Sequence, residues 1–173
     1  MLRLVDPLIN AKDSYRSLVA EIVAAGEEQV PFTLDYPNEN FAALVARLLG
    51  EARGIGVAPG WVPHSTFWLM EGEQVVGASN LRHRLTPKLR ISGGHIGYGI
   101  RPSARGRGLG KAILKLTLVR AAHIGIESAL LTCADANFAS AAVIVANGGE
   151  LEAKEYVAER GVVQRRYWVP TDS

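Results

Sequence analysis

The chain has 173 residues, 48% of them hydrophobic and 21% charged, which is the composition of an ordinary globular domain with one sizeable core. No apolar run approaches the roughly 18 residues that cross a bilayer, and the N-terminal stretch lacks the apolar core of a secretory signal. The single cysteine, Cys133, excludes an internal disulfide framework and a cysteine-based zinc site. We therefore expect a cytoplasmic protein that contacts no membrane.

Charge is distributed unevenly along the chain. Between residues 74 and 126 there are ten Lys or Arg and no Asp or Glu, which leaves nine cations and seventeen acids for the rest. This division predicts either a locally positive surface or ion pairs between the middle of the chain and its acidic ends.

The first third of the chain predicts a short strand, two helices and a loop. Residues 2–5 have the pattern of a strand, and residues 13–26 and 38–54 each place apolar side chains on one helical face. The glycine- and proline-rich residues 54–63 predict an ordered loop, because they also carry apolar side chains. The two apolar faces consist of Tyr15, Leu18, Val19, Ile22 and Val23 in the first helix, and of Phe41, Leu44, Val45 and Leu48 in the second.

After residue 64 the pattern changes to strands interrupted by two helices. The helix over 108–125 has an apolar face formed by Leu109, Ala112, Ile113, Leu116 and Val119. The expected elements are, in chain order, a hairpin over 65–85 turning at 71–73, a strand over 93–102, the helix over 108–125, a strand over 127–133, a helix over 137–149 and a hairpin over 150–168.

A glycine-rich turn connects the strand over 93–102 to the following helix. Gly106, Gly108 and Gly110 allow the backbone to approach a bulky anion, and the first N–H groups of a helix have no intrahelical partner. Arg107 and Lys111 put positive charge at the helix end that prefers anions, which indicates a bound phosphate. The alternative is a tight connection with solvated arginines. The Walker and dinucleotide-binding patterns both fail here.

The turn resembles the R-x-x-G-x-G motif of the GCN5-related N-acetyltransferases (GNAT). The matching residues run from Arg105 to Gly110, and the Asn137–Ser140 segment resembles the later Asn-x-x-Ser helix of that family. The resemblance extends over most of the chain. It implies an α/β (α+β) fold with a mixed, mostly antiparallel central sheet, flanking helices and splayed central strands. It also implies one domain over 1–173, with acceptor-side helices about 9–60, a cofactor-binding core about 66–150 and a C-terminal hairpin over 151–170.

The resemblance implies acetyl-CoA as co-substrate, with no metal. The pantetheine arm would enter between the splayed strands, and the pyrophosphate would lie on the turn. The residues that the resemblance assigns to the cofactor are Ile100, Arg105, Gly106, Arg107, Gly108, Leu109, Gly110, Lys111, Asn137 and Ser140.

The catalytic residues depart from the pattern of the family. The central strands have no carboxylate to act as base, and Ile144 occupies the position of the tyrosine that the family uses as acid. The remaining candidates are His83 in the preceding hairpin, and Tyr98 and His95, which strand alternation places on opposite faces unless a bulge intervenes. The glycines of this strand predict such a bulge or the close approach of a ligand.

The N-terminal helices and their loops would cover the acceptor side. Glu27 and Glu28 are candidates to receive a cationic amine, and Trp68 is a candidate apolar wall. We expect a small-molecule or peptide amine as acceptor and no nucleic acid, and the closing hairpin suits a homodimer edge. Two alternatives remain open, a non-catalytic acyl-CoA sensor of the same fold and a nucleic-acid-binding module that uses the basic middle segment.

Overall fold

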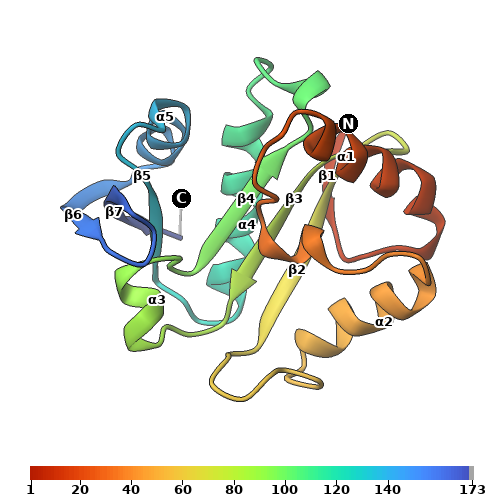
Figure 1. Cartoon of the computed structure of the whole chain (residues 1–173), viewed down its shortest axis with the longest axis horizontal. Coiled ribbons are helices and arrows are strands. Elements are labelled where there is room, and N and C mark those ends of the chain that lie inside the picture. The colour runs from red at the N-terminus through yellow and green to blue at the C-terminus, as the bar shows by residue number, and fades with distance from the viewer. Residues whose placement is uncertain (172–173) are drawn as a thin grey trace.

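The structure is a computed structural model that describes residues 1–171. Its strands form two antiparallel sheets that diverge from each other (Figure 1). The first sheet has the order β1-β2-β3-β4, with β1 Leu2–Val5, β2 His64–Glu71, β3 Gln74–Arg82 and β4 Ile96–Ile100. The second has the order β5-β7-β6, with β5 Ser128–Ala134, β6 Glu150–Val157 and β7 Val162–Pro170.

Helices cover both faces of the first sheet (Figure 1). The helices are α1 Lys12–Ala24, α2 Phe41–Glu51, α3 Pro87–Ile91, α4 Leu109–His123 and α5 Phe138–Ala146. Because successive side chains of a strand point to opposite faces, Trp68 and Met70 of β2 pack with α1 and α2, whereas Leu69 packs with α4. The expected mixed fold with flanking helices is confirmed.

The buried side of α4 differs from the predicted apolar face. Val119 is exposed, and the buried positions follow a different ridge, which consists of Leu109, Ile113, Leu114, Thr117, Leu118 and Ala121. Thr117 is polar yet fully buried, because its hydroxyl bonds Ser79 Oγ at 2.7 Å and donates to the Ile113 carbonyl at 2.8 Å. Apolar side chains lie on both faces of α4, so their spacing did not show which face is buried; contacts with β1, β3 and β4 decide it.

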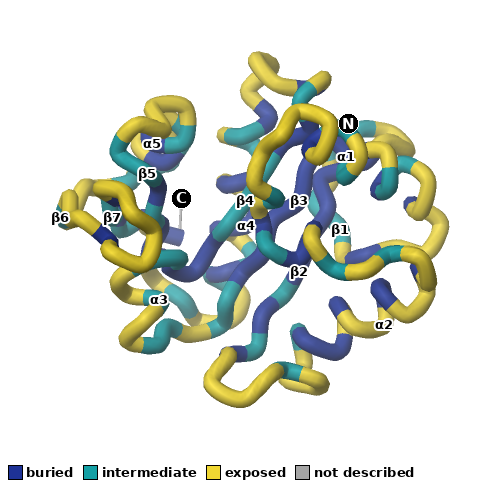
Figure 2. The backbone as a smooth tube through the Cα atoms, in the orientation of Figure 1, coloured by how far each residue is buried: buried dark blue, intermediate teal, exposed yellow. Residues whose placement is uncertain are grey.

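The two sheets meet next to the start of β4, where residues 93–95 contact β5. The His95 N–H donates to the Leu130 carbonyl at 2.7 Å, and the Leu130 N–H donates to His95 Nδ1 at 2.8 Å. A Cβ at Gly94 would lie 2.3 Å from the Leu130 oxygen, so only glycine permits this approach. Beyond this point the strands separate; β5 is mostly buried, whereas Gly97, Tyr98 and Gly99 in the middle of β4 are only partly buried (Figure 2). The expected splaying is confirmed.

Within residues 1–171, no helix combines the length and the apolar character that crossing a bilayer requires.

Candidate acetyltransferase site

A cleft of about 790 Å³ occupies the opening between β4 and β5. It extends from the start of α4, past β4 and the N-terminus of α5, to residues 27–32 and the end of β3. A cleft of this volume is within the usual range for small-molecule sites. It is therefore the place where a ligand of the splayed strands would lie.

The glycine-rich turn forms one end of this cleft. Gly106 and Gly108 both have φ of +76°, and Gly108 precedes α4 directly. A Cβ at either glycine would meet no atom within 4 Å, so the space above the turn is open. Gly110 has a different role, because a Cβ there would lie 3.3 Å from Val143 of α5. The free N–H groups of α4 thus open onto the cleft, as an anion site requires.

Ion pairs neutralise two of the arginines near this turn. Arg105 donates to both carboxylate oxygens of Glu27, at 2.7 and 2.6 Å, and to the Ile100 carbonyl at 3.0 Å. Arg107 pairs with Glu71 at 2.7 Å and lies outside the cleft lining. Lys111 lines the cleft and has no ion pair among residues 1–171. The positive field at the turn therefore comes from backbone N–H groups and Lys111.

Ion pairs connect the basic middle segment, residues 74–126, to acids elsewhere in the chain. Four of the ten cations in the basic middle segment pair with acids from outside it. The ion-pair interpretation thus holds for these four positions, which are Lys88, Arg101, Arg105 and Arg107.

Tyr98 reaches into the cleft from β4. Its hydroxyl lies 3.1 Å from Ser140 Oγ, and Asn137 caps α5 by accepting the Ser140 N–H at 3.1 Å. Burial raises the pKa of Tyr98 to about 12, so the phenol keeps its proton at neutral pH. Ile144 is fully buried in the core and does not line the cleft. Tyr98 is therefore the tyrosine that the fold brings to Ser140.

Most of the residues singled out in the sequence line the cleft. Four do not, namely Arg107, His83, His95 and Trp68. Those that do are Glu27, Glu28, Tyr98, Ile100, Arg105, Gly106, Gly108, Leu109, Gly110, Lys111, Asn137 and Ser140.

Trp68 and His95 have structural surroundings instead. Trp68 is fully buried among Tyr15 and Phe41, with ring centroids at 4.7 and 6.0 Å, so its side chain does not reach an acceptor. His95 joins β4 to β5 through Leu130, as described above, and its ring is buried. We assign neither residue to the reaction.

The pH dependence of stability provides a test of the role of His95. Burial, with Arg90 and Arg82 nearby, lowers the pKa of His95 from 6.5 to about 4. The unfolded chain binds the imidazole proton more tightly than the folded protein does. The contribution of neutral His95 to the free energy of unfolding is therefore complete above pH 6.5 and is lost as the pH falls toward 4. At pH 5 we expect a loss of about 2 kcal/mol in the free energy of unfolding.

Urea unfolding at pH 7.5 and pH 5.0 measures this loss. The variant His95→Asn does not titrate in this range, so it is expected to show a loss smaller by that amount. An equal loss in both proteins would mean that His95 is not the group responsible.

The glycines of β4 make room for the chain itself. The pairing of β4 with β3 runs without a register shift from Ile96 to Ile100, so β4 has no bulge. A Cβ at Gly99 would lie 2.2 Å from the Val30 carbonyl oxygen, and one at Gly97 would contact Pro31. Of the two alternatives for these glycines, the bulge is not observed, and Val30 and Pro31 of the chain itself approach β4 closely.

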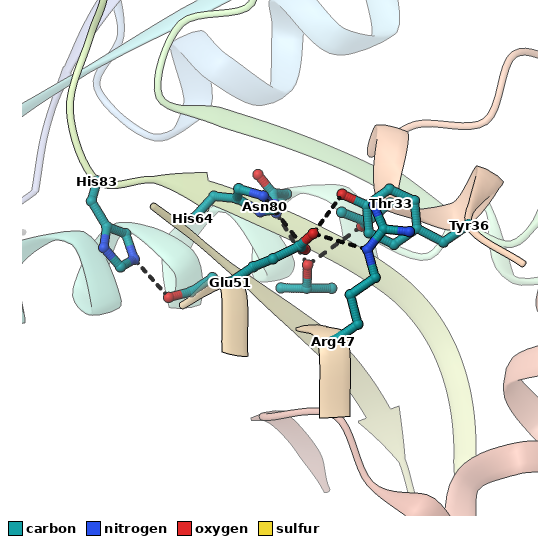
Figure 3. Close-up of polar contacts among 9 residues, drawn as sticks. Thr33, Tyr36, Arg47, Glu51, His64, Asn80 and His83 are labelled. Carbon is teal, nitrogen blue, oxygen red and sulfur yellow. Dashed lines mark hydrogen bonds and ion pairs between the residues drawn. The ribbon is translucent and has the colours of Figure 1, made fainter. Parts of the chain in front are cut away.

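A buried polar network that was not expected from the sequence holds residues 32–36, which directly follow this segment (Figure 3). Glu51 accepts from Arg47 Nε at 3.0 Å and from the Tyr36 hydroxyl at 3.2 Å, and lies 3.5 Å from His64 Nε2. Asn80 Nδ2 donates to His64 Nδ1 at 2.9 Å. These contacts connect α2, β2 and β3 to residues 32–36. The polar residues within otherwise apolar strands were the sequence signal for it.

Comparison with protein families identifies the chain. Residues 12–150 match the model of the acetyltransferase (GNAT) domain. No curated protein sequence matches it. Among residues 1–171, no group of three or more His, Cys, Asp or Glu side chains is arranged to hold a metal ion.

Several solved acetyltransferases have a similar fold. One is the Salmonella typhimurium enzyme that modifies the N-terminal serine of ribosomal protein L7/L12, with a TM-score of 0.71, 19% identity and coverage of 98% of this chain and 94% of that one. Microcin C7 self-immunity acetyltransferase MccE, solved with acetyl-CoA and AMP, has a TM-score of 0.71 at 14% identity, with coverage of 98% and 92%. Mycobacterium smegmatis RimJ, solved with CoA-disulfide, has 0.72 at 16%, with coverage of 98% and 81%. These structures share the fold, and the family model spans most of the sequence, so the chain belongs to the GNAT family of acetyltransferases.

Proposed function

We propose that this chain transfers an acetyl group from acetyl-CoA to a primary amine of a small molecule or peptide. The observation that carries the proposal is a continuous cleft, which begins at the free N–H groups of α4 and continues between separated strands to Tyr98 and Ser140. MccE and RimJ were solved with acetyl-CoA and CoA-disulfide, respectively, which supports the same donor here.

The cleft offers separate contacts to the parts of the donor. The amides of residues 105–111 and Lys111 would hold the pyrophosphate. Among residues 1–171, the edge of β4 that faces β5 has no strand partner between Gly97 and Ile100, so its backbone groups are available to the amides of the pantetheine arm. Asn137 and Ser140 would lie beside the thioester end.

Tyr98 is suited to stabilise the departing thiolate. A thiol has an ordinary pKa of about 8.5, well below the pKa of about 12 of Tyr98. Complete proton transfer from this phenol to the thiolate is therefore unfavourable, and Tyr98 would act as a hydrogen-bond donor. Ser140 orients the phenol from the other side.

The two carboxylates that line the cleft are weak candidates for a general base. Glu27 is held by Arg105, which lowers the pKa of its carboxyl group, and Glu28 lies 3.4 Å from Arg160. The amine would then lose its proton to solvent before it attacks, and the cleft would act mainly by positioning the two substrates.

A non-catalytic acyl-CoA sensor is the second candidate. The specific observation in its favour is Ile144, which is buried and apolar where many family members place the catalytic tyrosine. The sensor and the enzyme share the same binding cleft and differ only in turnover.

Two measurements separate these candidates. Isothermal titration with acetyl-CoA tests for binding, which both candidates require. Release of free CoA thiol in the presence of a panel of primary amines tests for transfer. Binding with amine-dependent thiol release supports the enzyme, binding without release supports the sensor, and absence of binding at millimolar acetyl-CoA contradicts both.

A further inference from the structure

The far end of the cleft, opposite the glycine-rich turn, contains an arginine without a counter-ion. Arg82 is the last residue of β3 and lines the cleft beside Phe32 and Gly93. Since β3 and β4 are antiparallel, Arg82 lies beyond Ile96, at the opposite end of β4 from Ile100 and the turn. Arg82 is therefore at the end where an acceptor, and not the pyrophosphate, would lie.

The contacts of Arg82 use only part of its guanidinium group. Nη1 donates to the carbonyls of Gly93 and Gly94, at 3.1 and 3.2 Å, and the group lies over the Phe32 ring at 5.3 Å. Among residues 1–171, Nε and Nη2 have no hydrogen-bond partner, and both stay accessible to solvent. These two nitrogens form one edge of the group, the side-on fork that a carboxylate fits with two parallel bonds.

The other arginines that line the cleft are already neutralised. Arg105 pairs with Glu27 at 2.6 Å, and Arg160 pairs with Glu28 at 3.4 Å. By contrast, no carboxylate among residues 1–171 lies within 4 Å of the Arg82 guanidinium. Burial lowers the pKa of Arg82, and no nearby acid offsets this effect. A partly desolvated cation without a counter-ion is unfavourable, so an anionic ligand would gain from the contact.

Two glutamines also line the cleft. The side-chain oxygens of Gln29 and Gln164 are buried and have no hydrogen-bond partner among residues 1–171. Unpaired buried acceptors favour a ligand that donates N–H groups. The cleft thus presents an unpaired cation and unpaired acceptors, which together complement a molecule with both an amine and an acid group.

Arg82 lies over the ring of Phe32, and Phe32 packs against His64 of the polar network in Figure 3. Phe32, over which Arg82 lies, packs edge-on against His64 at 5.3 Å, and Thr33 next to it accepts from Thr66 at 3.4 Å. His64 and Thr66 are buried in β2 and joined through Asn80. The Phe32 ring, which contacts the Arg82 guanidinium, is therefore held in place before any ligand binds.

We infer that the acceptor is an amine that also bears a carboxylate, such as an amino acid, and that Arg82 binds this carboxylate and selects for it. The inference rests on the proposed function, because it specifies the second substrate of the same cleft. Arg82 acts on acceptor binding and not on the chemical step.

Equilibrium binding of reaction products tests the inference without requiring turnover. The CoA-saturated protein is titrated calorimetrically with a series of N-acetyl amino acids and with the corresponding N-acetyl amino-acid amides, which lack only the charge. For at least one side chain, we expect the acid to bind about 10- to 100-fold more tightly than its amide, the range of a charge-assisted pair. In Arg82→Gln this ratio is expected to fall to about 1.

Arg84→Gln is the matched control. Arg84 lies two residues away, is exposed and does not line the cleft, so its removal changes the net charge equally and should leave the ratio unchanged. Circular dichroism of both variants checks that the fold is retained. In wild-type turnover, the amino acid should be preferred over its amide through a lower KM.

Several results would overturn the inference. In binding, these are equal affinity for acids and amides in the wild type, absence of binding of either, and a ratio that Arg82→Gln leaves intact. Thiol release with amines that lack a carboxylate, equal to that with amino acids, would also reject it while preserving the proposed function. Failure of acetyl-CoA itself to bind would instead reject the proposed function.

Discussion

Replacing Gly108 with valine is expected to weaken acetyl-CoA binding by about 100-fold. Gly108 has φ of +76° directly before α4, a conformation that a β-branched residue adopts only with strain. The valine would shift the first N–H groups of the helix and project its side chain into the open space above the turn. Loss of one charge-assisted contact to a diphosphate corresponds to about 10- to 100-fold in affinity, and displacement of several amides places the effect at the upper end.

Gly125→Val is the control for backbone strain. Gly125 follows the other end of α4 with φ of +84°, and a Cβ there would also meet open space. Urea unfolding should show that both variants lose about 1–2 kcal/mol in the free energy of unfolding. Only Gly108→Val should lose affinity in isothermal titration with acetyl-CoA. If the two variants bind the cofactor equally well, the turn is not the diphosphate site.

Tyr98→Phe is expected to lower kcat by about 100-fold and to leave the dissociation constant of acetyl-CoA unchanged. The substitution removes only the hydroxyl that lies 3.1 Å from Ser140 Oγ. Removing one hydrogen-bond donor to a developing negative charge typically lowers kcat by about 10²–10³. The ring stays to fill the space, so the core around β4 should be retained. Thiol release under saturating amine measures kcat, and isothermal titration measures binding.

The exposed Tyr156 of β6 supplies the matched control for this substitution. Tyr156→Phe removes the same hydroxyl from an exposed side chain that does not line the cleft, and should change neither quantity. Because the pKa of Tyr98 is about 12, kcat of the wild type should show no loss from deprotonation of this residue below about pH 11. A normal kcat in Tyr98→Phe would show that the backbone alone stabilises the thiolate.

Much of the fold follows from local patterns in the sequence. The hairpin of β2 and β3 turns at residues 71–73 as expected, and α2 begins after Asn40, whose side chain accepts the Ala43 N–H at 3.1 Å. Strand alternation and caps involve neighbouring residues, so they can be recognised without knowledge of the rest of the chain. The buried ridge of α4 was not predicted as well, because its partners come from β1, β3 and β4.

The residues of the candidate site also fall into those that local sequence predicts and those that only the fold brings together. The glycine-rich turn was recognisable because its residues are consecutive and each has a local conformational reason. The cleft residues Gln29, Arg82 and Gln164 were not recognisable, because they come from three distant parts of the sequence. Trp68 illustrates the converse error, since an aromatic residue on a strand faces either the cleft or the core, and only packing shows which.

The sequence by itself determined the order of the elements except α3, which it did not predict, together with the glycine-rich turn and the family to which the turn and the Asn137–Ser140 segment point. The tertiary structure alone decided which charges are free. Arg105 and Arg107 appeared as the phosphate-binding cations, but the fold gives each a carboxylate from more than thirty residues away, while it leaves Lys111 and Arg82 unpaired among residues 1–171. The physical reason is that electrostatic pairing depends on distance in space, and that distance is set only when remote segments pack together.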